Sequence, residues 1–154
     1  MQLYLIRHAH AVDADEDPER PLSRRGAEQV ARLADFLRRS DLFQPAEFWH
    51  TPLARSRETT LLLARRLRLE VPHTLMPDLE PEDDPRAAAR RIKAVAHSLA
   101  IVGHEPHLSS LATLLVVGKM EFPVFVMKKC SALALEGEGA HWSVRWHLSP
   151  DLIG

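Results

Sequence analysis

The chain has 154 residues, of which 45% are hydrophobic, 20 are Lys or Arg and 21 are Asp or Glu, for a formal net charge of −1. This length suits a single sizeable core, so we expect residues 1–154 to form one domain. The apolar content excludes a disordered chain, and the near-neutral charge gives no electrostatic basis for binding nucleic acid or an anionic membrane.

Cysteine use and hydropathy narrow the class of protein further. The single cysteine, Cys130, excludes an intramolecular disulfide and a zinc site built from cysteines. No stretch approaches the ~20 apolar residues that a membrane span needs, and the first residues lack the pattern of a signal peptide. We therefore expect a cytoplasmic protein that binds neither membranes nor nucleic acid.

The first predicted element is a short apolar strand that ends in a cation and an imidazole. Residues 3–6 are four consecutive large apolar residues, which is typical of a strand buried on both faces of a parallel sheet. Because an unpaired buried charge is costly, Arg7 and His8 are expected just past this strand, at the carboxyl edge of the sheet. Open α/β folds place ligands at that edge.

A loop and an amphipathic helix follow. Residues 12–21 form an acidic loop bounded by prolines, with Arg20 near its end. Ser23 can cap a helix in which apolar residues recur at i, i+3, i+4 and i+7 as far as about Arg39. Gly26 costs up to ~1 kcal/mol relative to Ala inside a helix, and we expect it to permit a close backbone contact.

The second strand–helix unit carries an informative arginine. Residues 48–50 predict a short strand, and Thr51-Pro52 predicts a helix start with Thr51 as the N-cap, the helix continuing to about Arg68. Arg55 then falls in the first turn, where a cation opposes the helix dipole. A bound anion would resolve this conflict, since helix N-termini and guanidinium groups both bind phosphate.

The rest of the chain predicts further strands and helices. A weak strand at 71–75 and a second acidic loop are followed by a helix over 86–98. Residues 99–103 form another fully buried type of strand, which ends in His104, and Pro106 opens the next helix. The expected elements after that are an irregular apolar stretch at 119–129 and a hairpin of residues 131–136 and 143–147, joined at 137–139.

Alternating strands and helices before a β tail predict a three-layer α/β/α sandwich with a mostly parallel central sheet. A single histidine after a strand is more often structural than catalytic, and helix-face arginines such as Arg25 are expected to be solvated. Here, however, the sheet edge receives His8 and His104 together with two arginines, which favours a shared oxyanion site.

Four segments, in this order, resemble the histidine phosphatase superfamily, whose fold is that of phosphoglycerate mutase. They are Arg7-His8, Arg20-Pro21-Leu22-Ser23 with Gly26, Thr51-Pro52-Leu53-Ala54-Arg55 and Val102-Gly103-His104. The short chain and the Arg20-Pro21-Leu22 segment look most like the SixA-type phosphohistidine phosphatases. One departure is Ala9, where the wider family usually has Gly.

The resemblance implies roles for these residues. His8 would be the nucleophile that becomes phosphorylated, and the phosphoryl group would be bound by Arg7, Arg55, His104 and Arg20. Neither a metal nor a cofactor is implied. Many members also use a carboxylic acid as proton donor, for which Glu105 and Glu80 are candidates. The SixA type lacks a clear acid, which suits a phosphohistidine substrate because imidazole leaves far more readily than an alkoxide.

The main hypothesis is a metal-independent phosphatase that removes phosphate from histidine on a signalling protein. The alternatives are a small-molecule phosphomonoesterase of the same superfamily, a metal-dependent phosphoesterase and a non-catalytic phosphoprotein-binding module. The metal-dependent reading would use His8 with His10, or His104 with His107, as ligands.

Overall fold

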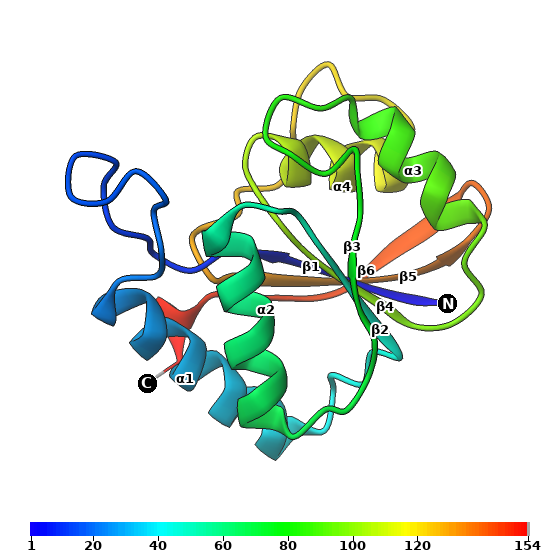
Figure 1. The fold of residues 1–154 in the computed structure, drawn as a ribbon. Helices are drawn as coiled ribbons and strands as arrows, with labels where there is room; N and C mark the ends of the chain where they lie inside the picture. Colours follow the sequence, from blue (N-terminus) through cyan, green and yellow to red (C-terminus); the bar gives the residue numbers. More distant parts are fainter. Residues whose placement is uncertain (154) are drawn as a thin grey trace.

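The computed structural model describes residues 1–153, which form a six-stranded sheet with helices on both faces (Figure 1). This arrangement confirms the predicted α/β/α sandwich. In chain order the elements are β1 (Gln2–Arg7), α1 (Arg24–Ser40), β2 (Glu47–His50), α2 (Ala54–Leu67), β3 (His73–Leu75), α3 (Pro85–Lys93), β4 (Leu99–Gly103), α4 (His107–Val117), β5 (Ala132–Glu138), β6 (His141–Leu148) and the 3₁₀ turn η1 (Pro150–Leu152).

The strand order in the sheet is β3-β2-β4-β1-β5-β6. The first four of these strands pair in parallel, whereas β5 is antiparallel to β1 and β6 is antiparallel to β5. The register pairs Arg7 of β1 with Gly103 of β4. The residues that follow, His8 and His104, therefore leave two neighbouring strands at the same edge of the sheet.

The two faces of the sheet carry separate apolar cores because side chains alternate along each strand. Leu3 and Leu5 belong to the core beneath α3 and α4, while Tyr4 and Ile6 belong to the core beneath α1 and α2. All four side chains are buried to within 1% of full burial. This two-sided burial is what the unbroken apolar run at residues 3–6 predicted.

The start of α1 follows the sequence prediction closely. The Ser23 hydroxyl accepts a hydrogen bond of 3.0 Å from the Gly26 amide, which makes Ser23 the N-cap. A Cβ atom at Gly26 would lie 2.1 Å from the carbonyl oxygen of His10. The expected close contact is therefore present, and it holds the start of α1 against the segment just after His8.

Several predicted boundaries were wrong, and three of these differences matter most. The helix α2 begins at Ala54, not Pro52, and its N-cap is Leu53, because the hydroxyl of Thr51 bonds to His104 instead. The helix α3 ends at Lys93 rather than Ser98, and its last turn closes before the chain enters the buried strand β4.

The third difference lies in the late hairpin. Its turn is at Gly139-Ala140 rather than at 137–139, because Gly137 pairs with Trp142 within the ladder. The stretch 119–129 contains neither helix nor strand, as predicted. No helix within residues 1–153 has the length and apolar character required to cross a bilayer.

Candidate active site

His8 lies at the end of β1 with its ring held by the main chain. Its side chain is only 5% exposed, and its amide donates to the Gly103 carbonyl at 3.0 Å. The Nδ1 atom lies 2.8 Å from the carbonyl oxygen of Ala9. A carbonyl oxygen only accepts, so Nδ1 carries the proton, and the lone pair of the neutral ring is on Nε2. Nε2 makes no hydrogen bond to any side chain or backbone group in residues 1–153.

The surroundings of His8 keep the imidazole neutral. Burial is the main cause that lowers the pKa of His8 to about 4, against a partial opposing effect of the hydrogen bond to Ala9. The positive charges of Arg55, Arg7 and Lys129 lower this pKa further. At neutral pH the ring is therefore unprotonated, which is the state that a nucleophilic nitrogen requires.

His104 lies beside His8, with ring centroids 5.2 Å apart and an interplanar angle of 50°. Its Nε2 is 2.8 Å from the hydroxyl of Thr51, which also accepts a hydrogen bond of 3.3 Å from the Leu53 amide. A hydroxyl has one proton and two acceptor sites, so Thr51 has room to accept from Leu53 and to donate its proton to Nε2 at the same time. In that arrangement the ring proton of His104 is on Nδ1, which is buried and has no partner within residues 1–153.

The pKa of His104 is lowered to about 3, first by burial and then by the charges around it. Among these are His8, Arg55 and Arg7. A neutral ring with a proton on Nδ1 is a hydrogen-bond donor that does not need to be charged. It is suited to an oxygen atom of a bound anion, since that oxygen would satisfy the otherwise orphaned N–H.

Arg7 and Arg55 bring guanidinium groups to the same place. Arg7 is the last residue of β1 and donates from Nη1 to the Met127 carbonyl at 2.9 Å. Arg55 is the second residue of α2, in the first turn as predicted. Each has a buried Nε without a partner in the described part of the chain. Burial lowers the pKa of both groups, and a bound anion would offset this cost.

Arg20 contributes a further positive charge at the base of the acidic loop, which projects from the body of the protein in Figure 1. Its Nε donates to the Val12 carbonyl at 3.1 Å, which closes the loop on itself. Burial lowers the pKa of Arg55 most, and the positive charge of Arg20 lowers it further. The structure thus brings Arg20 into the electrostatic field of the predicted site.

Three residues near these groups were missed from the sequence. Thr51 had been interpreted as a helix cap, and Lys129 lies in the irregular stretch. Thr59 accepts from the Ala9 amide at 3.0 Å and donates to the Arg55 carbonyl at 2.7 Å, so it links two segments of the site. A signal was available for Thr59, because the core-facing positions 56, 59, 60 and 63 of α2 carry three hydroxyl residues and one leucine.

The two candidate proton donors are placed differently. Glu105 follows His104, and its charge raises the pKa of Arg7 against the larger, lowering effect of burial. Both carboxylate oxygens of Glu105 accept hydrogen bonds from Ser109, one from the amide at 2.8 Å and one from the hydroxyl. Glu80 is exposed in the loop before α3, where its amide donates to Asp83. No contact brings its side chain to the other site residues.

The histidine pairs proposed as metal ligands do not converge within residues 1–153, where no group of three or more His, Cys, Asp and Glu is placed to hold an ion. His10 turns to α1 and lies 2.6 Å from the Ser23 hydroxyl. His107 is buried at the start of α4, with neither ring nitrogen hydrogen-bonded to another described residue.

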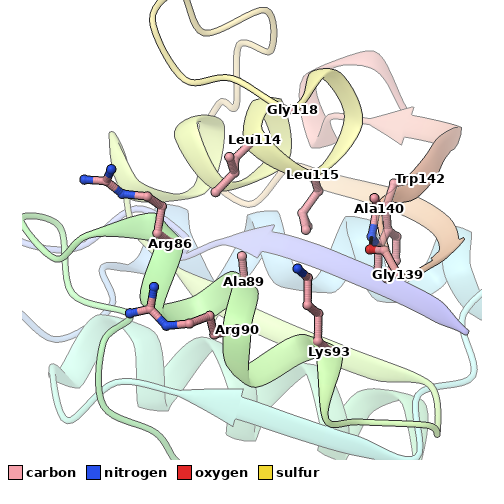
Figure 2. Close-up of a pocket in the computed structure, with 10 residues that line it drawn as sticks. All are labelled: Arg86, Ala89, Arg90, Lys93, Leu114, Leu115, Gly118, Gly139, Ala140 and Trp142. Carbon is pink, nitrogen blue, oxygen red and sulfur yellow. Dashed lines mark hydrogen bonds between the residues drawn. The ribbon is translucent and has the colours of Figure 1, made fainter.

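A cavity of about 330 Å³ lies away from this site. It is enclosed by α3, α4 and the turn between β5 and β6, with Leu114, Leu115 and Trp142 among its lining residues (Figure 2). This turn lies at the amino end of β1, since Met1 bonds to Gly137 there. None of the predicted site residues lines this cavity.

The model of the histidine phosphatase superfamily (branch 1) matches residues 3–80, just over half of the chain. The chain belongs to this superfamily. A curated member, phosphohistidine phosphatase SixA of Escherichia coli strain K12, is 24% identical over 155 residues, covering 97% of this chain and 94% of SixA.

Solved structures of the superfamily share the fold. A structure of the protein histidine phosphatase SixA complexed with tungstate has a TM-score of 0.87 and 23% identity, covering 99% of both chains. A mycobacterial glucosyl-3-phosphoglycerate phosphatase complexed with VO3 has a TM-score of 0.69 and 16% identity, covering 93% of this chain and 96% of that one.

Proposed function

We propose that this chain is a metal-independent cytoplasmic phosphatase that removes the phosphoryl group from phosphohistidine on a signalling protein, through a phosphohistidine intermediate on His8. The observation that carries the proposal is a set of three buried nitrogen atoms around a neutral imidazole, none of which has a hydrogen-bond partner within residues 1–153. They belong to Arg7, Arg55 and His104. Buried donors are normally paired, and a tetrahedral oxyanion would accept from all three.

The chemistry follows from the tautomer of His8. Its Nε2 lone pair attacks phosphorus in line, while the bond from phosphorus to the nitrogen of the substrate imidazole breaks. The substrate ring carries a proton from solvent on its other nitrogen, so it keeps the electron pair and leaves as a neutral imidazole. The developing charge on the equatorial oxygens is met by the guanidinium groups of Arg7 and Arg55, with Arg20 adding to the field. His104 donates from Nδ1 without becoming charged.

In the second step a water molecule attacks the phosphorus atom of phospho-His8. The bond to Nε2 breaks, the electron pair returns to the His8 ring, and inorganic phosphate leaves. The proton that the attacking water loses passes to solvent. A neutral leaving imidazole, whose conjugate acid has a pKa of about 6.5, needs no dedicated acid at neutral pH. This suits a site in which both oxygens of Glu105 are occupied by Ser109.

Similarity favours a phosphohistidine substrate over others. SixA matches this chain over nearly its whole length in both sequence and structure, and its structure was solved with tungstate, a tetrahedral oxyanion. A second candidate, hydrolysis of small phosphate monoesters, is favoured by the likeness to the glucosyl-3-phosphoglycerate phosphatase. The two reactions differ in whether they need a proton donor. An alkoxide leaving group needs one, whereas a leaving imidazole does not.

The decisive experiment compares wild type with His8→Ala on a histidine-phosphorylated protein. Wild type should release phosphate with a chelator present and should carry radiolabel on His8 after rapid acid-free quenching. His8→Ala should show neither turnover nor label. The control is His141→Ala, which removes an exposed imidazole at the far end of the sheet and should behave as wild type.

Each alternative has its own outcome. Turnover that survives in His8→Ala refutes the covalent route, and turnover abolished by the chelator refutes metal independence. Binding of the phosphoprotein with no label on wild-type His8 would identify a non-catalytic module. Rapid hydrolysis of sugar phosphates with no activity on phosphohistidine would establish the second candidate in place of the first.

A further inference from the structure

A basic cleft adjoins the proposed active site and is not used by the chemistry described above. Its volume is about 560 Å³. Arg7 lies in its wall and so belongs both to the cleft and to the phosphoryl site. The other lining residues are His10, Arg25, Gln29, Arg32, Lys128, Lys129, Pro150 and Asp151.

The cations of this cleft come from separate parts of the chain. Arg25 and Arg32 stand seven residues apart on α1, and therefore on one face of the helix, with Gln29 between them. Lys128 and Lys129 reach the cleft from the irregular stretch that follows α4. Asp151 is the one carboxylate in the lining, and it is paired with Lys128 at 3.1 Å.

Local structure does not account for these charges. Arg25 lies in the first turn of α1, where a cation opposes the helix dipole, and that turn contains no acidic residue. Arg24 beside it pairs with Glu28, whereas Arg25 and Arg32 have no ion pair within residues 1–153. The expectation that Arg25 is only a solvated helix-face residue was therefore incomplete, because its side chain lines a concave surface.

The charges of the cleft and those of the proposed site act on one another. Burial lowers the pKa of Lys129, and the nearby charges of Arg7, Arg20 and Arg25 lower it further, against an opposing effect of Asp13. Like charges that face one another in this way repel, and an incoming anion relieves the repulsion. The cleft, of about 560 Å³, is much larger than a phosphoryl group.

We propose that this cleft binds an acidic segment of the phosphorylated protein, and so selects phosphohistidines that are flanked by Asp or Glu. The inference rests on the proposed function and adds to it a sequence preference in the substrate. A concave surface with five cations and one paired carboxylate is complementary to an acidic chain that continues beyond the phosphorylated residue.

The test uses two peptides that each carry one phosphohistidine, flanked either by glutamates or, at the same positions, by glutamines. Wild type should have a kcat/KM about tenfold higher for the acidic peptide, and this preference should decline as salt is added. In the double variant R25E/R32E the ratio of the two kcat/KM values should fall to one or below. The ratio is measured within one enzyme, so a partly unfolded preparation does not change it.

The matched control is R90E/K93E, which makes the same change in charge beside the cavity of Figure 2. Arg90 and Lys93 are exposed on α3, and their replacement should leave the ratio at its wild-type value. A wild-type enzyme that hydrolyses both peptides equally well overturns this inference and leaves the proposed function intact. One that hydrolyses neither overturns both, and an equal loss of preference in both double variants refutes the cleft as its source.

Discussion

The hydroxyl of Thr51 lies 2.8 Å from Nε2 of His104, and the two residues follow neighbouring strands of the sheet, β2 and β4. Thr51 is fully buried, and its oxygen also accepts from the Leu53 amide. This contact holds the His104 ring in place, and a Thr51 hydroxyl that donates to Nε2 leaves the ring proton on Nδ1. We regard Thr51 as a positioning residue that acts through His104.

Thr51→Val should lower kcat about tenfold, because it keeps the shape of the side chain but leaves Nε2 of His104 buried and unpaired. Thr51→Ser keeps the hydroxyl and should restore most of the activity. The measurement is steady-state kinetics on phosphohistidine for the two variants, with circular dichroism to confirm the fold. A Ser variant as impaired as the Val variant would show that Thr51 acts only through packing.

Arg55→Lys should reduce kcat/KM by about 10²-fold, since an ammonium group cannot reproduce the planar fork that donates to two oxygens of a phosphoryl group. The control is Arg57→Lys on the same helix, where the arginine is exposed and its guanidinium group donates to the Pro52 carbonyl. Inhibition by tungstate should weaken in parallel in the Arg55 variant. Unchanged tungstate inhibition would place Arg55 outside the anion site.

Acidification should destabilise the protein through His8. The folded-state pKa is about 4, while the unfolded ring has its ordinary value of 6.5, so between these values the unfolded state binds more protons. This contribution to the free energy of unfolding is complete above 6.5 and is lost as pH falls through about 4. His104 acts in the same direction, with a folded pKa of about 3.

Urea unfolding at several pH values across this window should show the decline, and NMR titration of the His8 ring protons should place their midpoint well below 6. His8→Asn has no titrating ring at this position, and its stability should decline less steeply. A wild-type ring that titrates near the ordinary value would contradict the burial and charge arguments together.

Glu105→Gln should change kcat on phosphohistidine by less than about twofold, because the leaving imidazole does not require an acid. The Gln side chain retains an oxygen that can accept from the Ser109 amide, so the start of α4 is preserved. The same assay on an alkyl phosphate tests whether Glu105 protonates poorer leaving groups. A large loss on phosphohistidine itself would make Glu105 the general acid after all.

The fold was predictable where local pattern and tertiary environment agree. Residues 3–6 are apolar because both faces of β1 are covered, and Ser23 caps α1 as its position suggests. Gly26 was predicted to allow a close approach, and the His10 carbonyl makes it. In each case the residue type is determined by its immediate structural surroundings.

The remaining features depend on contacts between distant segments. Thr51 has the sequence context of an N-cap, but its hydroxyl is used by His104, which is 53 residues away. Lys129 lies near the site because the irregular stretch that contains it passes beside β1. The pattern of apolar residues in the sequence does not predict the course of such a stretch. That Arg7, His8, Arg55 and His104 lie near one another was predictable, because each is at or just past the end of a strand, or in the first turn of a helix, at the same sheet edge.

The hydrogen bond from Arg7 to the Met127 carbonyl connects the proposed site to the irregular stretch at residues 119–129. The stretch that supplies this carbonyl has no regular hydrogen-bonding ladder, and its outer surface presents Phe122, Val124 and Val126 to solvent. These exposed side chains are therefore free to change, yet the same stretch holds the guanidinium group of Arg7, the neighbour of His8 in the chain. Laboratory evolution of new substrate preferences should begin with these side chains, because their replacement would shift the carbonyl that holds Arg7 in the proposed site without a large loss of folding free energy.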